Sequence, residues 1–136
     1  MDQKGFRSAA RRLVVELIFA ICLVSFGAEF PEDVTFATAW TFVVQHANLL
    51  LHVVIGTLIL VESSALAVHS LKGKHRSWKV FSLIGLCFVL LAYGSGEGVL
   101  SGRGESALGM MTVGWLGAIL VYATAWFKTR AKQKET

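Results

Sequence analysis

The sequence predicts an all-α protein, a bundle of four transmembrane helices that forms a single integral membrane domain over residues 1–136. Charged residues make up 16% of the chain and hydrophobic residues 54%, and the mean hydropathy is +0.60. Soluble proteins carry about 25% charged residues, so this composition is typical of the membrane class. The hydrophobic residues gather into four runs that short polar segments separate.

The four runs predict helices over about residues 12–28, 38–66, 78–95 and 106–127. Each run supplies the roughly 20 residues that cross a bilayer, once its interfacial ends are included. The first run follows Arg11 and Arg12, as the core of a cleaved signal sequence would. Glu16 is a poor core residue for a signal, so we expect an uncleaved helix.

The charges alternate along the chain. The N-terminal tail, the segment 72–79 and the C-terminal tail are basic, whereas the segment 29–33 is acidic and the glycine-rich segment 94–106 is nearly neutral. Because basic segments stay on the cytoplasmic side, both termini are expected to be cytoplasmic, in a bacterial inner membrane. The basic residues lie at helix ends, so the net charge of +4 does not indicate a nucleic-acid partner. The expected partners are membrane lipid and either further copies of the chain or other membrane subunits.

A line of polar and small residues follows the second predicted helix, and we call it the His52 stripe. At ~100° per residue its members fall within ~40° of one direction. They are Thr41, Gln45, Asn48, His52, Gly56, Ile59 and Ser63. Hydrocarbon cannot satisfy their hydrogen bonds, so we expect the stripe to face other helices.

Each of the other helices also has a face that is expected to turn inward. On the first helix it consists of Glu16, Ala20, Leu23 and Gly27; on the third, of Ser82, Gly85, Val89, Ala92 and Gly96; on the fourth, of Ser106, Met110, Val113, Gly117, Val121 and Thr124. Trp115 falls outside the fourth face. The glycines at 56, 85 and 117 either leave space for a flat ligand or let helices touch, and helix contact is the commoner use.

The depths of the two histidines in the membrane limit how they could hold a haem. His52 lies ~18 Å inward from Trp40, near the bilayer midplane, whereas His46 lies ~9 Å inward and ~120° around the helix. The two come from one helix, so they cannot hold one haem iron from opposite sides. Each is a candidate haem ligand by itself, and Met110 lies at the right depth to pair with His46.

The candidate cofactor-binding residues are therefore His52, His46, Gln45, Asn48, Gly56 and Met110. Ionisable groups inside a membrane usually mark a functional site. Two kinds of ligand are therefore open: haem b, or a quinone, proton or other small ligand. The same residues could instead only bond helices together, at about 0.6 kcal/mol per hydrogen bond. No nucleophile–base set or closed metal site is present, so the chain is not expected to be catalytic by itself.

Two segments carry a resemblance to known proteins. QHANLLLHVVIGTLIL and YGSGEGVLSGRGESALGMM resemble a group of small bacterial four-helix membrane proteins, and the likeness covers the second to fourth helices. More distantly, the chain is similar to b-type cytochrome bundles, in which histidines on transmembrane helices hold haem. It departs from those bundles because its membrane histidines lie on one helix.

The function expected on these grounds is that of a small membrane accessory or anchor subunit in a respiratory or redox assembly. The His52 stripe would bind haem b or quinone. The alternatives are a small transporter or channel subunit with a polar path along the second helix, and a purely structural membrane subunit.

Overall fold

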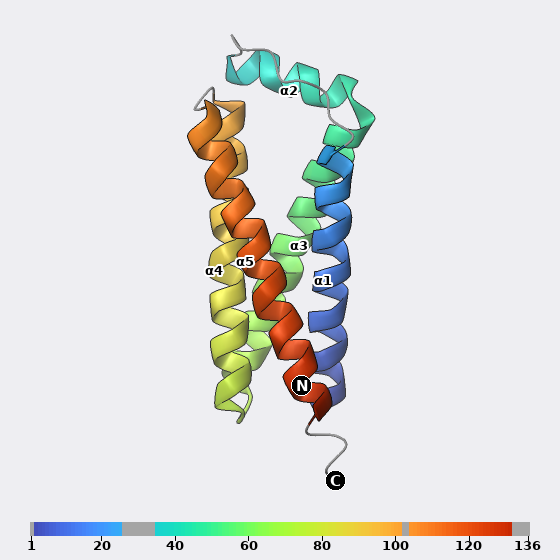
Figure 1. The fold of residues 1–136 in the computed structure, drawn as a ribbon, viewed down its shortest axis with the longest axis vertical. Coiled ribbons are helices and arrows are strands. Elements are labelled where there is room, and N and C mark those ends of the chain that lie inside the picture. Colours follow the sequence, from blue (N-terminus) through green and yellow to red (C-terminus); the bar gives the residue numbers. More distant parts are fainter. Residues whose placement is uncertain (1, 26–34, 102–103, 132–136) are drawn as a thin grey trace.

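The computed structural model describes residues 2–25, 35–101 and 104–131, and this part of the chain is entirely helical apart from short connections. Its helices are α1 (Gln3–Ser25), α2 (Phe36–Gln45), α3 (Ala47–Lys72), α4 (Arg76–Leu100) and α5 (Gly104–Ala131). The helices α1, α3, α4 and α5 lie side by side in a long bundle, and α2 lies across one end of it (Figure 1). Gly27, the acidic segment 29–33 and the last five residues lie outside the described part.

Within the described residues, three helices are long and apolar enough to cross a membrane: α3, α4 and the part of α5 from Glu105 to Thr129. Large apolar side chains cover their outer surfaces; Val61 is 60% exposed and Leu120 68%. Such surfaces suit lipid better than water. The first predicted span is not among the three, because α1 carries a charged first half, with Lys4, Arg7, Arg11, Arg12 and Glu16.

Neighbouring helices run in alternating directions. The start of α1, the end of α5 and the connection between α3 and α4 all lie at one end of the bundle (Figure 1). The helix α2, the end of α4 and the start of α5 lie at the opposite end (Figure 1). The three basic segments of the sequence thus begin or end at the same end of the molecule.

The helix predicted over residues 38–66 is interrupted at His46, which corrects the sequence-based prediction. His46 is extended, with φ −111° and ψ 102°, and its backbone N–H donates to the Val43 carbonyl at 3.2 Å. The ring Nδ1 donates to the Phe42 carbonyl at 2.8 Å. The imidazole therefore replaces the backbone donor that a continuous helix would have given Phe42, which stabilises the end of α2.

The third predicted helix is longer than expected, because α4 continues to Leu100 through most of the glycine-rich segment. Ser95 and Gly98 are buried in this extension, and its end is closed by the Ser101 N–H, which donates to the Glu97 carbonyl at 3.0 Å. The small residues thus allow close packing rather than forming a loop.

The inward face predicted for the third helix is confirmed: Ser82, Gly85, Val89 and Ala92 are buried on α4. This face packs tightly on α5. A methyl group added to Gly114 would lie 2.6 Å from the Ala92 nitrogen, and one added to Gly117 would collide with the Phe88 ring. Gly85 is likewise covered by the Tyr122 ring. These glycines bring the two helices into contact.

The face predicted for the fourth helix is wrong. Met110, Val113 and Thr124 are exposed, and the buried residues of α5 lie about 100° further round. The buried set is Ala107, Gly114, Trp115, Ala118, Tyr122, Ala125 and Thr129. Two large aromatic side chains fill the space beside α3 and α4, and this burial outweighs the small and polar residues that suggested the other face.

Candidate functional site

His52 is the polar group that connects three helices of the bundle. It lies in the second turn of α3, and its Nδ1 is 2.9 Å from the Ala20 carbonyl of α1. A carbonyl only accepts, so Nδ1 carries the proton and donates. In neutral His52 the other ring nitrogen, Nε2, is then an acceptor with its lone pair available, as in histidines that hold a ligand or metal.

Trp115 packs against His52 from α5. The two ring centroids are 5.8 Å apart with an interplanar angle of 64°, an edge-to-face contact. Trp115 is only 7% exposed, and its Nε1–H has no hydrogen-bond partner in the described part of the chain. A buried indole N–H normally finds an acceptor, so this donor is unusual.

Gly56 lies one turn along α3 from His52, and the space at its α-carbon is open. It is buried, yet a methyl group added there would meet no atom within 4 Å. The contrast with the α4–α5 contact is clear, because methyl groups at Gly85, Gly114 and Gly117 would all collide with neighbours. The sequence left both uses of glycine open, and the structure assigns open space to Gly56 and helix contact to the other three.

The buried side of α3 continues from Gly56 through Ile59 to Ser63. Beside it lies Tyr122 of α5, which is fully buried. The Tyr122 hydroxyl and the Ser63 hydroxyl are polar neighbours of each other in this buried region.

The remaining predicted site residues are not gathered around His52. The interruption at His46 puts Thr41 and Gln45 on α2, where both are exposed, while Asn48 is partly buried in the first turn of α3. The His46 ring bonds Phe42 and packs on its ring at 4.0 Å between centroids. Met110 is half exposed near the start of α5. The stripe thus splits, and only its part from His52 to Ser63 faces the bundle.

A second polar cluster joins α1 to α3. Arg12 Nε lies 2.8 Å from Glu62 Oε2 and 3.9 Å from Glu16 Oε1. Arg12 and Glu16 come from α1, and Glu62 comes from the facing helix α3. Glu16 Oε2 is buried and has no hydrogen-bond partner among the described residues.

The fit of a haem at His52 is limited to one axial bond. Nε2 could bind iron while Nδ1–H bonds a carbonyl, the usual arrangement of a ligating histidine. Trp115, which cannot ligate iron, packs against the ring, and the described residues contain no group of three or more His, Cys, Asp or Glu for a metal. His46 does not supply a second histidine ligand, because its ring bonds the Phe42 carbonyl at the α2–α3 junction.

Trp115 is the site residue that the sequence analysis missed. Tryptophan in membrane proteins gathers at the two interfaces, but Trp115 lies well inside the long apolar stretch Glu105–Thr129. That position is the signal that could have identified it, since an indole N–H in hydrocarbon requires a protein or ligand acceptor.

Comparison of the chain with models of known protein families gave no match, and neither did comparisons with curated proteins and with solved structures.

Proposed function

We propose that this chain is a small membrane accessory or anchor subunit of a respiratory or redox assembly, and that it binds the polar head of a quinone at His52 and Trp115. The observation that carries the proposal is the hydrogen bond from His52 Nδ1 to the Ala20 carbonyl beside the buried Trp115. This bond makes His52 Nε2 an acceptor. Trp115 Nε1–H, which has no hydrogen-bond partner among the described residues, is a donor.

A donor and an acceptor on neighbouring rings can each serve one state of a quinone. Trp115 Nε1–H can donate to a quinone carbonyl, and His52 Nε2 can accept from a quinol hydroxyl. Gly56, one turn along α3 from His52, adds open space on the same side of that helix. A bound quinone would supply the electron and proton carrying; the chain would hold and orient its head group. Haem b uses Nε2 alone and leaves Trp115 Nε1–H without a partner, so the quinone fits the residues better.

We also propose that α1 is a fourth span and that both termini are cytoplasmic, in a bacterial inner membrane. Beyond Arg12 the outer side of α1 is apolar, with Val15, Ile18 and Phe19 exposed. The helix lies alongside α3 and α5 in the bundle (Figure 1). The basic segments meet at one end of the bundle, as positive-inside topology requires.

The test is to purify the protein from its membrane in mild detergent and extract its ligands. We expect chromatography of the extract to yield a quinone, and Trp115→Phe to retain much less of it, because phenylalanine keeps a ring but has no N–H. Trp126→Phe, near the C-terminal end of α5, is the matched control and should retain the wild-type amount of quinone. A sharp b-type absorption band after reduction, with no quinone, would replace quinone by haem. A preparation with neither would overturn the redox role.

A further inference from the structure

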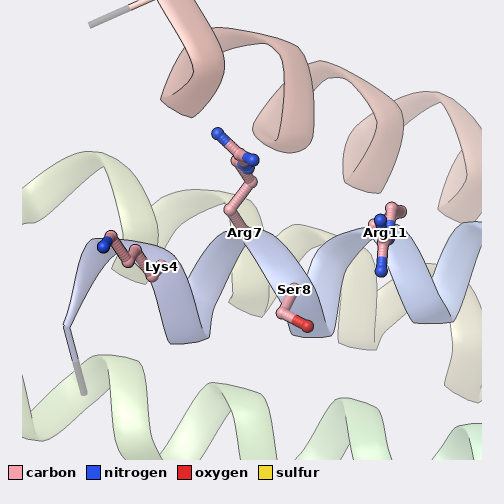
Figure 2. Close-up of a pocket in the computed structure, with 4 residues that line it drawn as sticks. All are labelled: Lys4, Arg7, Ser8 and Arg11. Carbon is pink, nitrogen blue, oxygen red and sulfur yellow. The ribbon is translucent and has the colours of Figure 1, made fainter. Parts of the chain in front are cut away.

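A further polar site, separate from the His52 region and from the Arg12–Glu62 pair, lies on α1 at the end of the bundle where the chain begins. Its pocket is lined by Lys4, Arg7, Ser8 and Arg11, which all come from α1, and has a volume of about 230 Å³. Figure 2 shows Arg7 reaching from α1 toward α5, with Lys4 and Arg11 one to two turns apart along the same helix. Three cationic side chains and a hydroxyl line one small cavity, which suits a phosphate group.

The pocket is held in a fixed place. Gln3 Nε2 donates to the Thr129 carbonyl of α5 at 3.0 Å, and Phe6 stacks on Trp78 of α4 with centroids 4.9 Å apart. These contacts fix the first turns of α1 against the ends of two other helices. The basic segment 72–79 lies at the same end of the bundle (Figure 1).

The same side of α1 changes from basic to apolar along its length. Lys4, Ser8, Arg11, Val15, Ile18 and Cys22 fall within ~40° of one direction, and all six are exposed. The stretch from Arg11 to Cys22 covers ~16 Å, about half of a hydrocarbon core, which is the depth of one leaflet. Beside the basic pocket there is thus an apolar strip long enough for an acyl chain.

We infer that this side of α1 binds an anionic phospholipid of the leaflet on the basic side of the membrane. The phosphate would lie in the pocket of Lys4, Arg7, Ser8 and Arg11, and an acyl chain would lie along Val15 and Ile18. Charge complementarity favours an anionic headgroup. The neighbouring Arg12 does not line the pocket; it lies 2.8 Å from Glu62 of α3. A free phosphate ion would use the pocket but gain nothing from the apolar strip.

The experiment measures lipid binding to the full chain by native mass spectrometry. The protein is titrated with phosphatidylglycerol, with phosphatidylcholine and with inorganic phosphate. We expect selective binding of phosphatidylglycerol, and Lys4→Gln with Arg11→Gln should weaken it about 30-fold, at the usual contribution of a cation near a membrane surface. Lys4→Arg with Arg11→Lys should bind as the wild type does, because the charges remain.

The matched control is Lys72→Gln with Lys74→Gln, which removes two charges from the same end of the bundle without touching the pocket. It should leave phosphatidylglycerol binding within about twofold of the wild type. Equal losses in this control and in the pocket variant would show general attraction and overturn the site. Displacement of the lipid by millimolar phosphate, or equal binding of phosphatidylcholine, would also overturn it.

Discussion

The glycines of the bundle give a sharp test of its packing. A methyl group at Gly114 would lie 2.6 Å from the Ala92 nitrogen and 2.8 Å from the Phe88 carbonyl oxygen, both of them backbone atoms of α4. Ordinary contacts need about 3.5 Å or more, so α4 and α5 would have to separate by about 1 Å. At Gly56 the same methyl group would meet nothing within 4 Å. Gly114→Ala and Gly56→Ala are therefore one chemical change in two opposite environments.

The two variants should differ in sign. Overpacking costs about 1–3 kcal/mol, and the better helix propensity of alanine offsets about 0.5–1 kcal/mol of it. Gly114→Ala should thus lower the free energy of unfolding by about 0.5–2 kcal/mol. Gly56→Ala has only the propensity gain, and should raise this free energy by about 0.5–1 kcal/mol.

The assay is reversible unfolding in mixed micelles with increasing sodium dodecyl sulfate, followed by circular dichroism. Both variants are compared with the wild type in the same lipid-free detergent, so that ligand loss does not contribute. Equal stabilities of the two variants, or a less stable Gly56→Ala protein, would refute both the contact at Gly114 and the open space at Gly56.

Two further predictions concern topology and charge. After replacement of the native cysteines, a label on Lys74→Cys should be reached only from the cytoplasm and one on Ser101→Cys only from outside. Lys74 belongs to the connection between α3 and α4, Ser101 directly follows α4, and the two ends of α4 lie at opposite ends of the bundle (Figure 1). Access from the same side would contradict the proposed spans. A double-mutant cycle of Arg12→Gln and Glu62→Gln should give a favourable coupling of about 0.5–1 kcal/mol, since the pair joins two helices but stays partly exposed. A coupling of zero in unfolding measurements would mean that the 2.8 Å contact does not stabilise the fold.

The all-α class and one inward helix face followed from sequence because they depend on composition and period. The small residues Ser82, Gly85 and Ala92 recur at helical spacing on α4, and close packing in a membrane selects for small residues. The inward face of α5 could not be found in this way. Its small residues occur all round, and the burial of Trp115 and Tyr122 depends on the space that α3 and α4 leave.

The interruption of the helix at His46 could not be predicted from hydrophobic periodicity. Neither glycine nor proline marks it, and apolar residues lie on both sides of it. A side-chain hydrogen bond from His46 Nδ1 to Phe42 O accompanies the break, and helical periodicity does not reveal it. As a result the sequence located His52, Gly56 and Ser63 on one buried side but added Thr41 and Gln45 to a line they do not share.

The most direct test of the central claim is the ligand content of His52→Leu beside that of His46→Leu. His52 bonds α1 and contacts Trp115, whereas His46 bonds its own helix, so each change removes an imidazole from a different setting. Both proteins are purified identically, their bound quinone is measured, and their unfolding is followed in detergent. We predict that His52→Leu loses the quinone while His46→Leu keeps it. A His52→Leu protein that stays fully loaded, and differs only by the roughly 0.6 kcal/mol of one interhelical hydrogen bond, would contradict the claim.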